Sequence, residues 1–170
     1  MNQARILRDS ERIEKIAKLA EAYHSLLSVI GPLLVNNIAF EAGIREGLNK
    51  FLANTWIYLN DNNKFAVDYY SEEAKKLING SAEDKGRLIY EHMIPKNIYQ
   101  KECVAAAKQG KNKSVAEIQD ILNKYWFIAI ITADEHKKLS KEKMPEDWDH
   151  SNIFSRYEKA KIKLTNNLTN

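Results

Sequence analysis

Two glutamate–histidine pairs are the residues of this sequence whose types and surroundings could support chemistry. Glu91-His92 lies at the end of an apolar segment just before Pro95, and Glu135-His136 follows a segment rich in aromatic and β-branched residues. Histidine changes charge near neutral pH and can accept a proton from an attacking water. Carboxylates and imidazoles also bind Mg²⁺ and first-row transition metals. The pairs therefore indicate proton transfer and metal binding, whereas a surface glutamate or a hydrogen-bonded core histidine would explain each residue singly.

The segments that must position these pairs are two predicted strands. Residues 87–94 form a short strand that stops at Pro95, and residues 125–132 form a second strand, with which we expect the first to pair. Neighbouring side chains of an ideal strand point to opposite faces, so Glu91 and His92 share one site only if the strand kinks or ends there. Thr132 is expected to cap a helix that runs to about Lys141 and carries His136 in its first turn.

This arrangement resembles the HNH, or ββα-metal, nuclease motif over residues 88–141. In that family a first strand ends in an acidic residue and a histidine, and a second strand leads into a helix with a metal-binding histidine. The resemblance implies a divalent metal, Mg²⁺ or a first-row transition metal, with Glu91 and His136 as ligands. It implies that His92 is the general base and that Lys137 or Lys138 approaches a DNA phosphate. A helical insertion, residues 97–124, must separate the two strands.

The charge of the chain is concentrated in its second half. The formal net charge of +3 is the sum of −1 from residues 1–95 and +4 from residues 96–170, where 14 Lys and Arg stand against 10 Asp and Glu. Five lysines stand against Glu102 alone in the stretch 96–113: Lys96, Lys101, Lys108, Lys111 and Lys113. Such a stretch is typical of a segment near phosphates or of a solvated helix and loop, and Lys96 is a candidate nucleic-acid contact.

A distinctive C-terminal segment, residues 144–162, contains Trp148, Phe154 and Tyr157, which we expect to pack on the core. Asp149 or Ser151 is expected to cap a last helix that runs to about Lys163. Arg156 lies within this helix. It would either form an ion pair with an acidic residue or contact phosphate.

The first half of the chain is predicted to be helical. Apolar residues at steps of three and four predict a helix over about 9–30, broken by Gly31-Pro32 and followed by a second helix to about Leu59. A third helical segment is expected over about 64–79, and residues 80–86 are the best internal boundary. The spacing of large apolar residues predicts a core that includes Ile13, Ile16, Tyr23, Leu27, Leu48, Leu52, Trp56, Trp126, Ile128 and Ile130.

These features predict an α+β fold that is predominantly α-helical: a helical N-terminal half, then a small ββα-like element with a helical insertion, and a C-terminal helix. Residues 1–79 would form a helical region for recognition or dimerisation, and residues 87–164 a ββα-metal-like region, within one compact domain. The 170 residues have globular composition, with 44% hydrophobic and 29% charged residues. One cysteine, Cys103, and no apolar run of membrane-spanning length lead us to expect a cytoplasmic protein with no membrane partner.

Two functions from different classes follow. The first is a metal-dependent DNA endonuclease-like protein, restriction- or phage-associated, that hydrolyses phosphodiester bonds, with a homo-oligomer formed through its helical half. The second is a non-catalytic helical interaction protein, such as an antitoxin, an immunity protein or a phage-encoded binding protein. Long amphipathic N-terminal helices favour the second, as does the lack of a counterpart to the middle asparagine of the nuclease motif.

Overall fold

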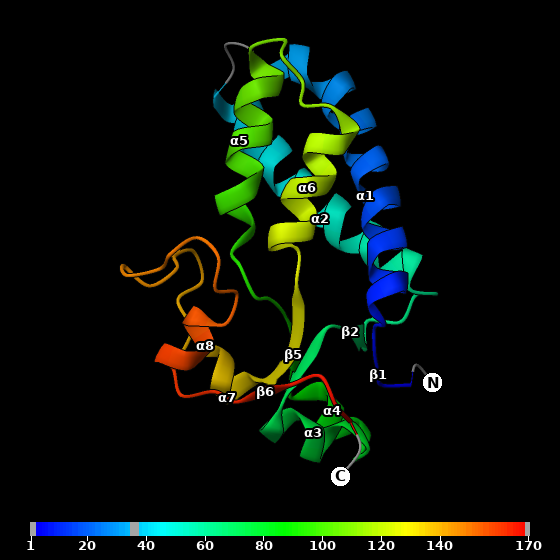
Figure 1. The fold of residues 1–170 in the computed structure, drawn as a ribbon, viewed down its shortest axis with the longest axis vertical. Coiled ribbons are helices and arrows are strands. Elements are labelled where there is room, and N and C mark those ends of the chain that lie inside the picture. The colour runs from blue at the N-terminus through cyan, green and yellow to red at the C-terminus, as the bar shows by residue number, and fades with distance from the viewer. Residues whose placement is uncertain (1–2, 35–37, 169–170) are drawn as a thin grey trace. The chain divides into compact units, whose positions relative to one another are not determined.

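The computed structural model describes residues 3–34 and 38–168 and confirms a predominantly helical α+β fold, 55% helix and 12% strand. The chain divides into two compact units (Figure 1). We call residues 1–8, 63–95 and 125–170 the sheet unit, and residues 9–62 and 96–124 the helical unit. Each unit is therefore assembled from segments that are separated in the sequence. In the described part of the chain, no helix is both long and apolar enough to cross a membrane.

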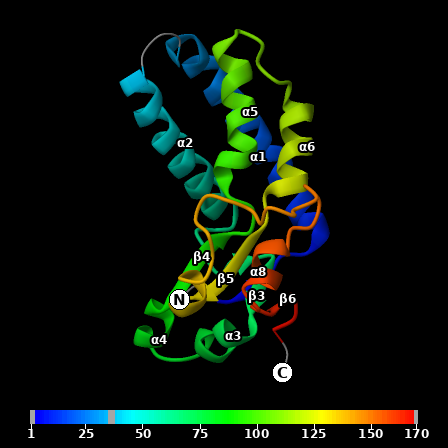
Figure 2. The ribbon, with the colours of Figure 1, turned by 90° about the vertical axis from the view of Figure 1, so that its left-hand side faces the viewer.

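Among its described residues, the helical unit contains four long helices and one short turn of 3-10 helix. Its elements are α1 (Asp9–Ile30), η1 (Gly31–Leu34), α2 (Ile38–Leu59), α5 (Lys96–Lys108) and α6 (Val115–Tyr125, whose last residue belongs to the sheet unit). The four helices α1, α2, α5 and α6 are labelled in Figure 2. A capping box is present before α6, because Ser114 Oγ accepts from Glu117 N at 3.3 Å while Glu117 Oε2 accepts from Ser114 N at 2.8 Å. At Gly31, an added Cβ would lie 2.9 Å from the backbone oxygen of Ala107, so η1 packs closely on α5.

The buried stripe of α1 is confirmed except at its first position. Ile16, Tyr23 and Leu27 are buried as predicted, whereas Ile13 is 54% exposed. Arg12 takes the place expected for Ile13, because it lies four residues before Ile16 on the same face of the helix. Its guanidinium reaches the backbone oxygen of Asn123 on α6 at 3.4 Å. The other predicted core residues are also buried: Leu48, Leu52, Trp56, Trp126, Ile128 and Ile130.

The sheet unit is built on a four-stranded sheet in the order β4-β5-β3-β6. Its strands are β3 (Tyr69–Ser71), β4 (Leu88–His92), β5 (Ile128–Thr132) and β6 (Leu164–Thr165), and β1 (Arg5–Ile6) pairs separately with β2 (Ala66–Val67). The predicted pairing of β4 with β5 is confirmed as antiparallel, with Glu91 opposite Ala129 and His92 opposite Ile128. Four short helices complete the unit: α3 (Glu72–Ile78), α4 (Ala82–Gly86), α7 (Ala133–His136) and α8 (Ser155–Lys159).

Three predicted helices are shorter than expected. Residues 66–71 form β2 and β3 instead of a helix, because they pair with β1 and β5 and bury Val67 and Tyr70. The helix after Thr132 ends at His136, and the last helix spans only Ser155–Lys159. Asp149 does not cap that helix. Its carboxylate accepts from the backbone nitrogens of Ser151 and Asn152, which lowers its pKa to about 2.

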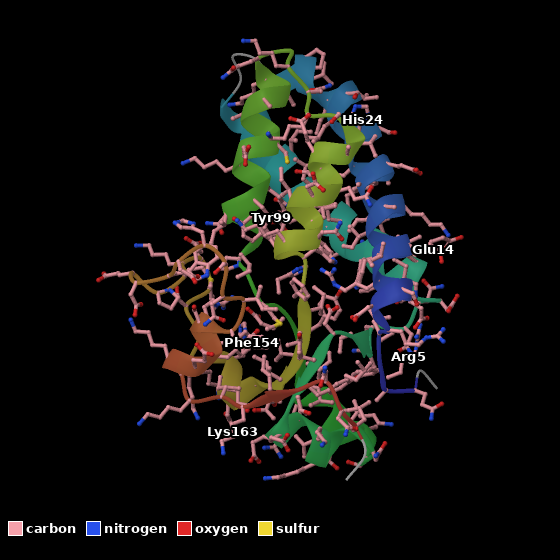
Figure 3. The ribbon with its side chains drawn as sticks, in the orientation of Figure 1. Arg5, Glu14, His24, Tyr99, Phe154 and Lys163 are labelled. Carbon is pink, nitrogen blue, oxygen red and sulfur yellow. The ribbon has the colours of Figure 1, made fainter. Side chains whose placement is uncertain are left out.

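The two faces of the β4–β5 pair carry different side chains. Met93, Ala129 and Ile131 belong to one buried cluster with Leu139, Tyr157 and Ile162, from the segments that follow β5. Strand alternation places Glu91 on this face. Tyr90, His92 and the facing Ile128 and Ile130 belong to the opposite face. Phe154, which is labelled in Figure 3, lies at the start of α8. Its ring packs edge-on against Tyr69 of β3, with ring centroids 5.1 Å apart.

A matched pair of substitutions in the helical unit tests the assignment of the buried face. Trp56→Ala removes a fully buried side chain and should lower the free energy of unfolding by about 3–5 kcal/mol. Ile13→Ala changes an exposed position and should alter stability by less than about 0.5 kcal/mol. Denaturant unfolding measures both. A loss of stability in Ile13→Ala as large as that in Trp56→Ala would show that the buried face of α1 is assigned wrongly.

Buried tyrosines predict a loss of stability at alkaline pH. Burial raises the pKa of Tyr23, Tyr70, Tyr90 and Tyr157 above the ordinary value of 10. Above that pH the unfolded chain releases phenolic protons that the folded chain retains, so stability falls as the pH rises. A spectrophotometric titration should show that part of the eight tyrosines ionises only together with the loss of circular dichroism. Smooth ionisation of all tyrosines in the folded protein would contradict this.

Candidate functional site

The fold brings Glu91 and His136 together. Glu91 lies near the end of β4 on the face covered by the cluster of Leu139 and Tyr157, and His136 is the last residue of α7, which directly follows β5. Because β4 pairs with β5, the turn of helix after β5 lies beside β4. His136 Nδ1 is 3.0 Å from Glu91 Oε2, and the side chains are 29% and 12% exposed.

The local structure around His136 is fixed by a capping box. Thr132 Oγ1 accepts from Glu135 N at 3.2 Å, and Glu135 Oε2 accepts from Thr132 N at 2.8 Å. Ser71 Oγ also donates to Glu135 Oε2, at 2.6 Å, and ties α7 to β3. The carboxylate of the buried residue Glu135 is therefore used in structural hydrogen bonds. In this respect the pair Glu135-His136 differs from the pair Glu91-His92.

The contact between Glu91 and His136 is close without being a well-aligned hydrogen bond. Nδ1 of His136 is buried and has no hydrogen-bond partner among the described residues, although Glu91 Oε2 is only 3.0 Å away. The carboxylate oxygen thus lies away from the direction in which the ring nitrogen would donate or accept. Glu91 Oε2 and His136 Nδ1 are therefore in contact but do not form a hydrogen bond with each other.

Arg156 holds the other oxygen of the Glu91 carboxylate. Its Nη2 lies 2.9 Å from Glu91 Oε1 and also donates to the backbone oxygen of Ser140, at 2.6 Å. Its Nη1 donates to the backbone oxygens of His92 and Met93, at 3.0 and 3.3 Å. The Arg156 side chain is only 2% exposed. The ion pair expected as one alternative is therefore present.

Tyr157 is a buried polar residue beside this group that the sequence identifies only as part of the core. Burial raises its pKa, the carboxylates of Glu91 and Glu135 raise it further, and Arg156 acts in the opposite direction. The phenol is therefore within the electric field of both carboxylates. The hydrogen bond from Ser71 to Glu135 was not predicted either, because the two residues are 64 positions apart in the sequence.

The structure separates the imidazole of His92 from Glu91 and His136. The His92 ring packs edge-on against Trp126 and Tyr90, with centroid distances of 4.7 and 5.8 Å. Pairing with β5 continues past His92, because Met93 N donates to the backbone oxygen of Phe127 at 2.9 Å. The strand therefore does not kink at His92, and ordinary alternation places its side chain on the face opposite Glu91.

The lysines predicted to contact phosphate also lie at separate places in the structure. Lys96 belongs to the helical unit, where its Nζ reaches the backbone oxygen of Asn49 at 3.3 Å. Lys137 forms an exposed ion pair with Asp134 at 2.8 Å. Lys138 lines a cavity of about 470 Å³ in the sheet unit, together with Lys143, Lys159, Glu146 and part of Arg156. Three lysines against one glutamate make this cavity electropositive, and Lys143 and Lys159 were not singled out from the sequence.

The separation of Glu91 Oε2 and His136 Nδ1 can be compared with the spacing of two ligands of one metal ion. Two ligands at neighbouring positions of an octahedral ion with bonds of about 2.1 Å lie about 3 Å apart, close to the 3.0 Å between Oε2 and Nδ1. Mg²⁺ usually keeps several waters and is held by one or two protein groups plus substrate phosphate. Among the described residues, no group of three or more His, Cys, Asp or Glu side chains is arranged to hold an ion.

In comparisons with protein-family models, with curated proteins and with solved structures, no match to the chain was found. The chemical interpretation of this site therefore depends on its own geometry: a carboxylate and an imidazole in contact, a buried arginine behind the carboxylate, and an electropositive cavity that Arg156 also lines.

A double-mutant cycle tests how strongly Arg156 and Glu91 depend on each other. Arg156→Met leaves the mostly buried Glu91 carboxylate without its guanidinium, and should lower the free energy of unfolding by about 3–5 kcal/mol. Replacing both residues, Arg156→Met with Glu91→Met, should recover most of that loss, because no uncompensated charge remains. Urea unfolding of the four proteins measures the coupling. Strictly additive losses would show that the pair is not coupled.

Proposed function

We propose that this chain is a metal-dependent nuclease that hydrolyses phosphodiester bonds in DNA, with Glu91 and His136 as the protein ligands of a divalent metal. The observation that carries this proposal is the 3.0 Å contact between two residues 45 positions apart, made by an antiparallel strand pair and the helical turn that follows it. A strand pair followed by a helix is also the order of elements that the resemblance to the ββα-metal motif implies.

A bound divalent metal would lower the pKa of a water ligand and neutralise the charge that develops on the phosphate. The protein residues prepare its two donor atoms. Arg156 orients the Glu91 carboxylate by holding Oε1 and leaves Oε2 turned toward His136. The capping box of α7 fixes the position of His136. Lys138, Lys143 and Lys159 supply positive charge that would attract a phosphate backbone.

His92 has a separate place in this proposal. Its imidazole packs against Trp126 on the face of β4 opposite Glu91. We expected His92 to act as the general base, and this role requires the imidazole to reach a water held near Glu91 and His136. His92→Ala is therefore the variant that distinguishes a base from an aromatic packing residue: a base is needed for cleavage but not for metal binding.

Cleavage of supercoiled plasmid DNA with Mg²⁺, Mn²⁺ or Ni²⁺ tests the function. Loss of a hydrogen-bonding partner behind a metal ligand typically costs 10–100-fold, so loss of a ligand itself should cost at least about 100-fold. We therefore expect Glu91→Gln and His136→Ala to weaken metal binding measured by calorimetry and to decrease cleavage by at least that factor.

The matched control is His150→Ala, which removes an exposed histidine of the same unit and should leave cleavage unchanged. If the folded wild-type protein neither cleaves DNA nor binds any of the three metals, the nuclease proposal is wrong. Cleavage that survives in both Glu91→Gln and His136→Ala would place the activity elsewhere or in a contaminant.

The second candidate is a non-catalytic helical interaction protein. Large apolar side chains are exposed on the helical unit: Ile13 and Val29 on α1, Leu33 on η1 and Tyr58 on α2, with exposed fractions of 54–72%. Such residues would suit contact with a partner or with a second copy of the chain. This function would remain if the folded protein shows neither cleavage nor metal binding.

A further inference from the structure

The electropositive cavity of about 470 Å³ in the sheet unit shares Arg156 with the proposed metal site. Arg156 lines the cavity, and its Nη2 lies 2.9 Å from Glu91 Oε1. The three lysines of the cavity come from separate segments (Figure 1): Lys138 lies just after α7, Lys143 lies in the loop that follows, and Lys159 is the last residue of α8. The fold, and not the periodicity of a single helix, therefore brings these cations to one place.

Neighbouring carboxylates do not neutralise these lysines. Among the described residues, none of the three forms an ion pair, and neither does Glu146, the one acidic residue of the described lining. The carboxylate of Asp134 pairs with Lys137 instead, at 2.8 Å. Lys137 is the main cause of the lowered pKa of Asp134, and Lys138 contributes least to it. The cavity therefore keeps most of its positive charge.

The net charge of the cavity matches a terminal phosphate better than a phosphodiester. Three lysines against Glu146 leave a net charge of +2, because Glu91 balances the charge of Arg156. A phosphodiester carries one negative charge, whereas a terminal phosphate has a second pKa of about 6 and carries a charge of about −1.5 to −2 at pH 7. The terminal phosphate therefore neutralises the cavity more completely.

Carbon atoms make up another part of the lining. Leu139, Met144, Pro145 and Ala160 line the cavity beside the lysines. Small-ligand sites usually combine an apolar lining with a few charged or polar groups, and the volume here is within their range. A sugar or a base attached to the phosphate would cover these carbons, and inorganic phosphate would not. The cavity therefore suits a nucleotide with a terminal phosphate.

We propose that this cavity holds the phosphate-bearing strand end that hydrolysis of a DNA phosphodiester produces. This role rests on the nuclease function proposed above. In that reaction a water oxygen bonds to phosphorus, one P–O ester bond breaks, and the leaving oxygen takes a proton and becomes a hydroxyl. The new terminal phosphate releases its remaining proton above its second pKa. Arg156 belongs to both sites, so the product would form close to the cations that retain it.

Calorimetric titration of the full chain with thymidine 5′-monophosphate and 3′-monophosphate tests the site. EDTA removes divalent metal, and low ionic strength limits screening. We expect at least one of the two isomers to bind, with one molecule per chain. The methyl ester of that monophosphate keeps the nucleotide but carries only one negative charge, so it should bind at least tenfold more weakly, as should thymidine and inorganic phosphate. Absence of monophosphate binding at millimolar concentration, or equal binding of the methyl ester, would overturn the proposal.

Charge variants test which residues hold the phosphate. Lys143→Gln and Lys159→Gln should each weaken binding of the monophosphate at least fivefold, whereas Glu146→Gln should strengthen it at least twofold. The matched control is Lys141→Gln, which changes an exposed lysine of the same loop outside the described lining and should bind like the wild type. All four positions are exposed, so the melting temperature should stay near that of the wild type. Equal weakening by Lys141→Gln and Lys143→Gln would indicate only the general charge of the chain and would overturn the site.

Plasmid cleavage separates the product site from the nuclease function itself. The monophosphate should inhibit cleavage by the wild type, and at least fivefold more of it should be needed to inhibit Lys143→Gln. Cleavage by a chain that does not bind the monophosphate would overturn this inference and leave the nuclease proposal standing. Binding by a folded chain that cleaves no DNA would keep the phosphate site and overturn its role as a product site.

Discussion

The sheet unit depends on the burial of one guanidinium. A charged group inside a protein is tolerated only when it is paired and hydrogen-bonded, and Arg156 meets this condition with the Glu91 carboxylate and three backbone oxygens. Its acceptors come from the end of β4 and from Ser140 beyond α7, while Arg156 itself lies on α8. One side chain therefore joins three segments, and it fixes the carboxylate that faces His136. The function proposed for this pair requires that the carboxylate be held before any metal arrives.

The antiparallel pairing of β4 with β5 is the second constraint. The two strands are separated in sequence by α5 and α6, yet their register, with Glu91 opposite Ala129, places α7 beside β4. Side-chain alternation then divides Glu91 from His92 and gives them different neighbours. One face of the strand pair carries a buried ion pair and a histidine, and the other carries aromatic rings.

The two units offer different kinds of unsatisfied polar atoms. In the sheet unit, a carboxylate oxygen and a ring nitrogen lie 3.0 Å apart without an aligned hydrogen bond, and these donor types are those that bind first-row transition metals. In the helical unit, Gln100 Nε2 and Asn49 Oδ1 are enclosed and have no hydrogen-bond partner among the described residues.

Local interactions explain which parts of this protein are predictable from its sequence. The long helix α1, the capping boxes at Ser114 and Thr132, and the strand character of β4 and β5 all follow from residues close together in the chain. Tertiary contacts decided the rest. Residues 66–71 became strands because β1 and β5 pair with them. Arg12 displaced Ile13 from the buried face because its guanidinium finds a backbone oxygen on α6. The sequence also indicated Glu91, His92 and His136 as a group, but strand register and the burial of Arg156 selected only Glu91 and His136 to meet. Such choices depend on partners far away in the chain, and local patterns carry no information about which partner will be present.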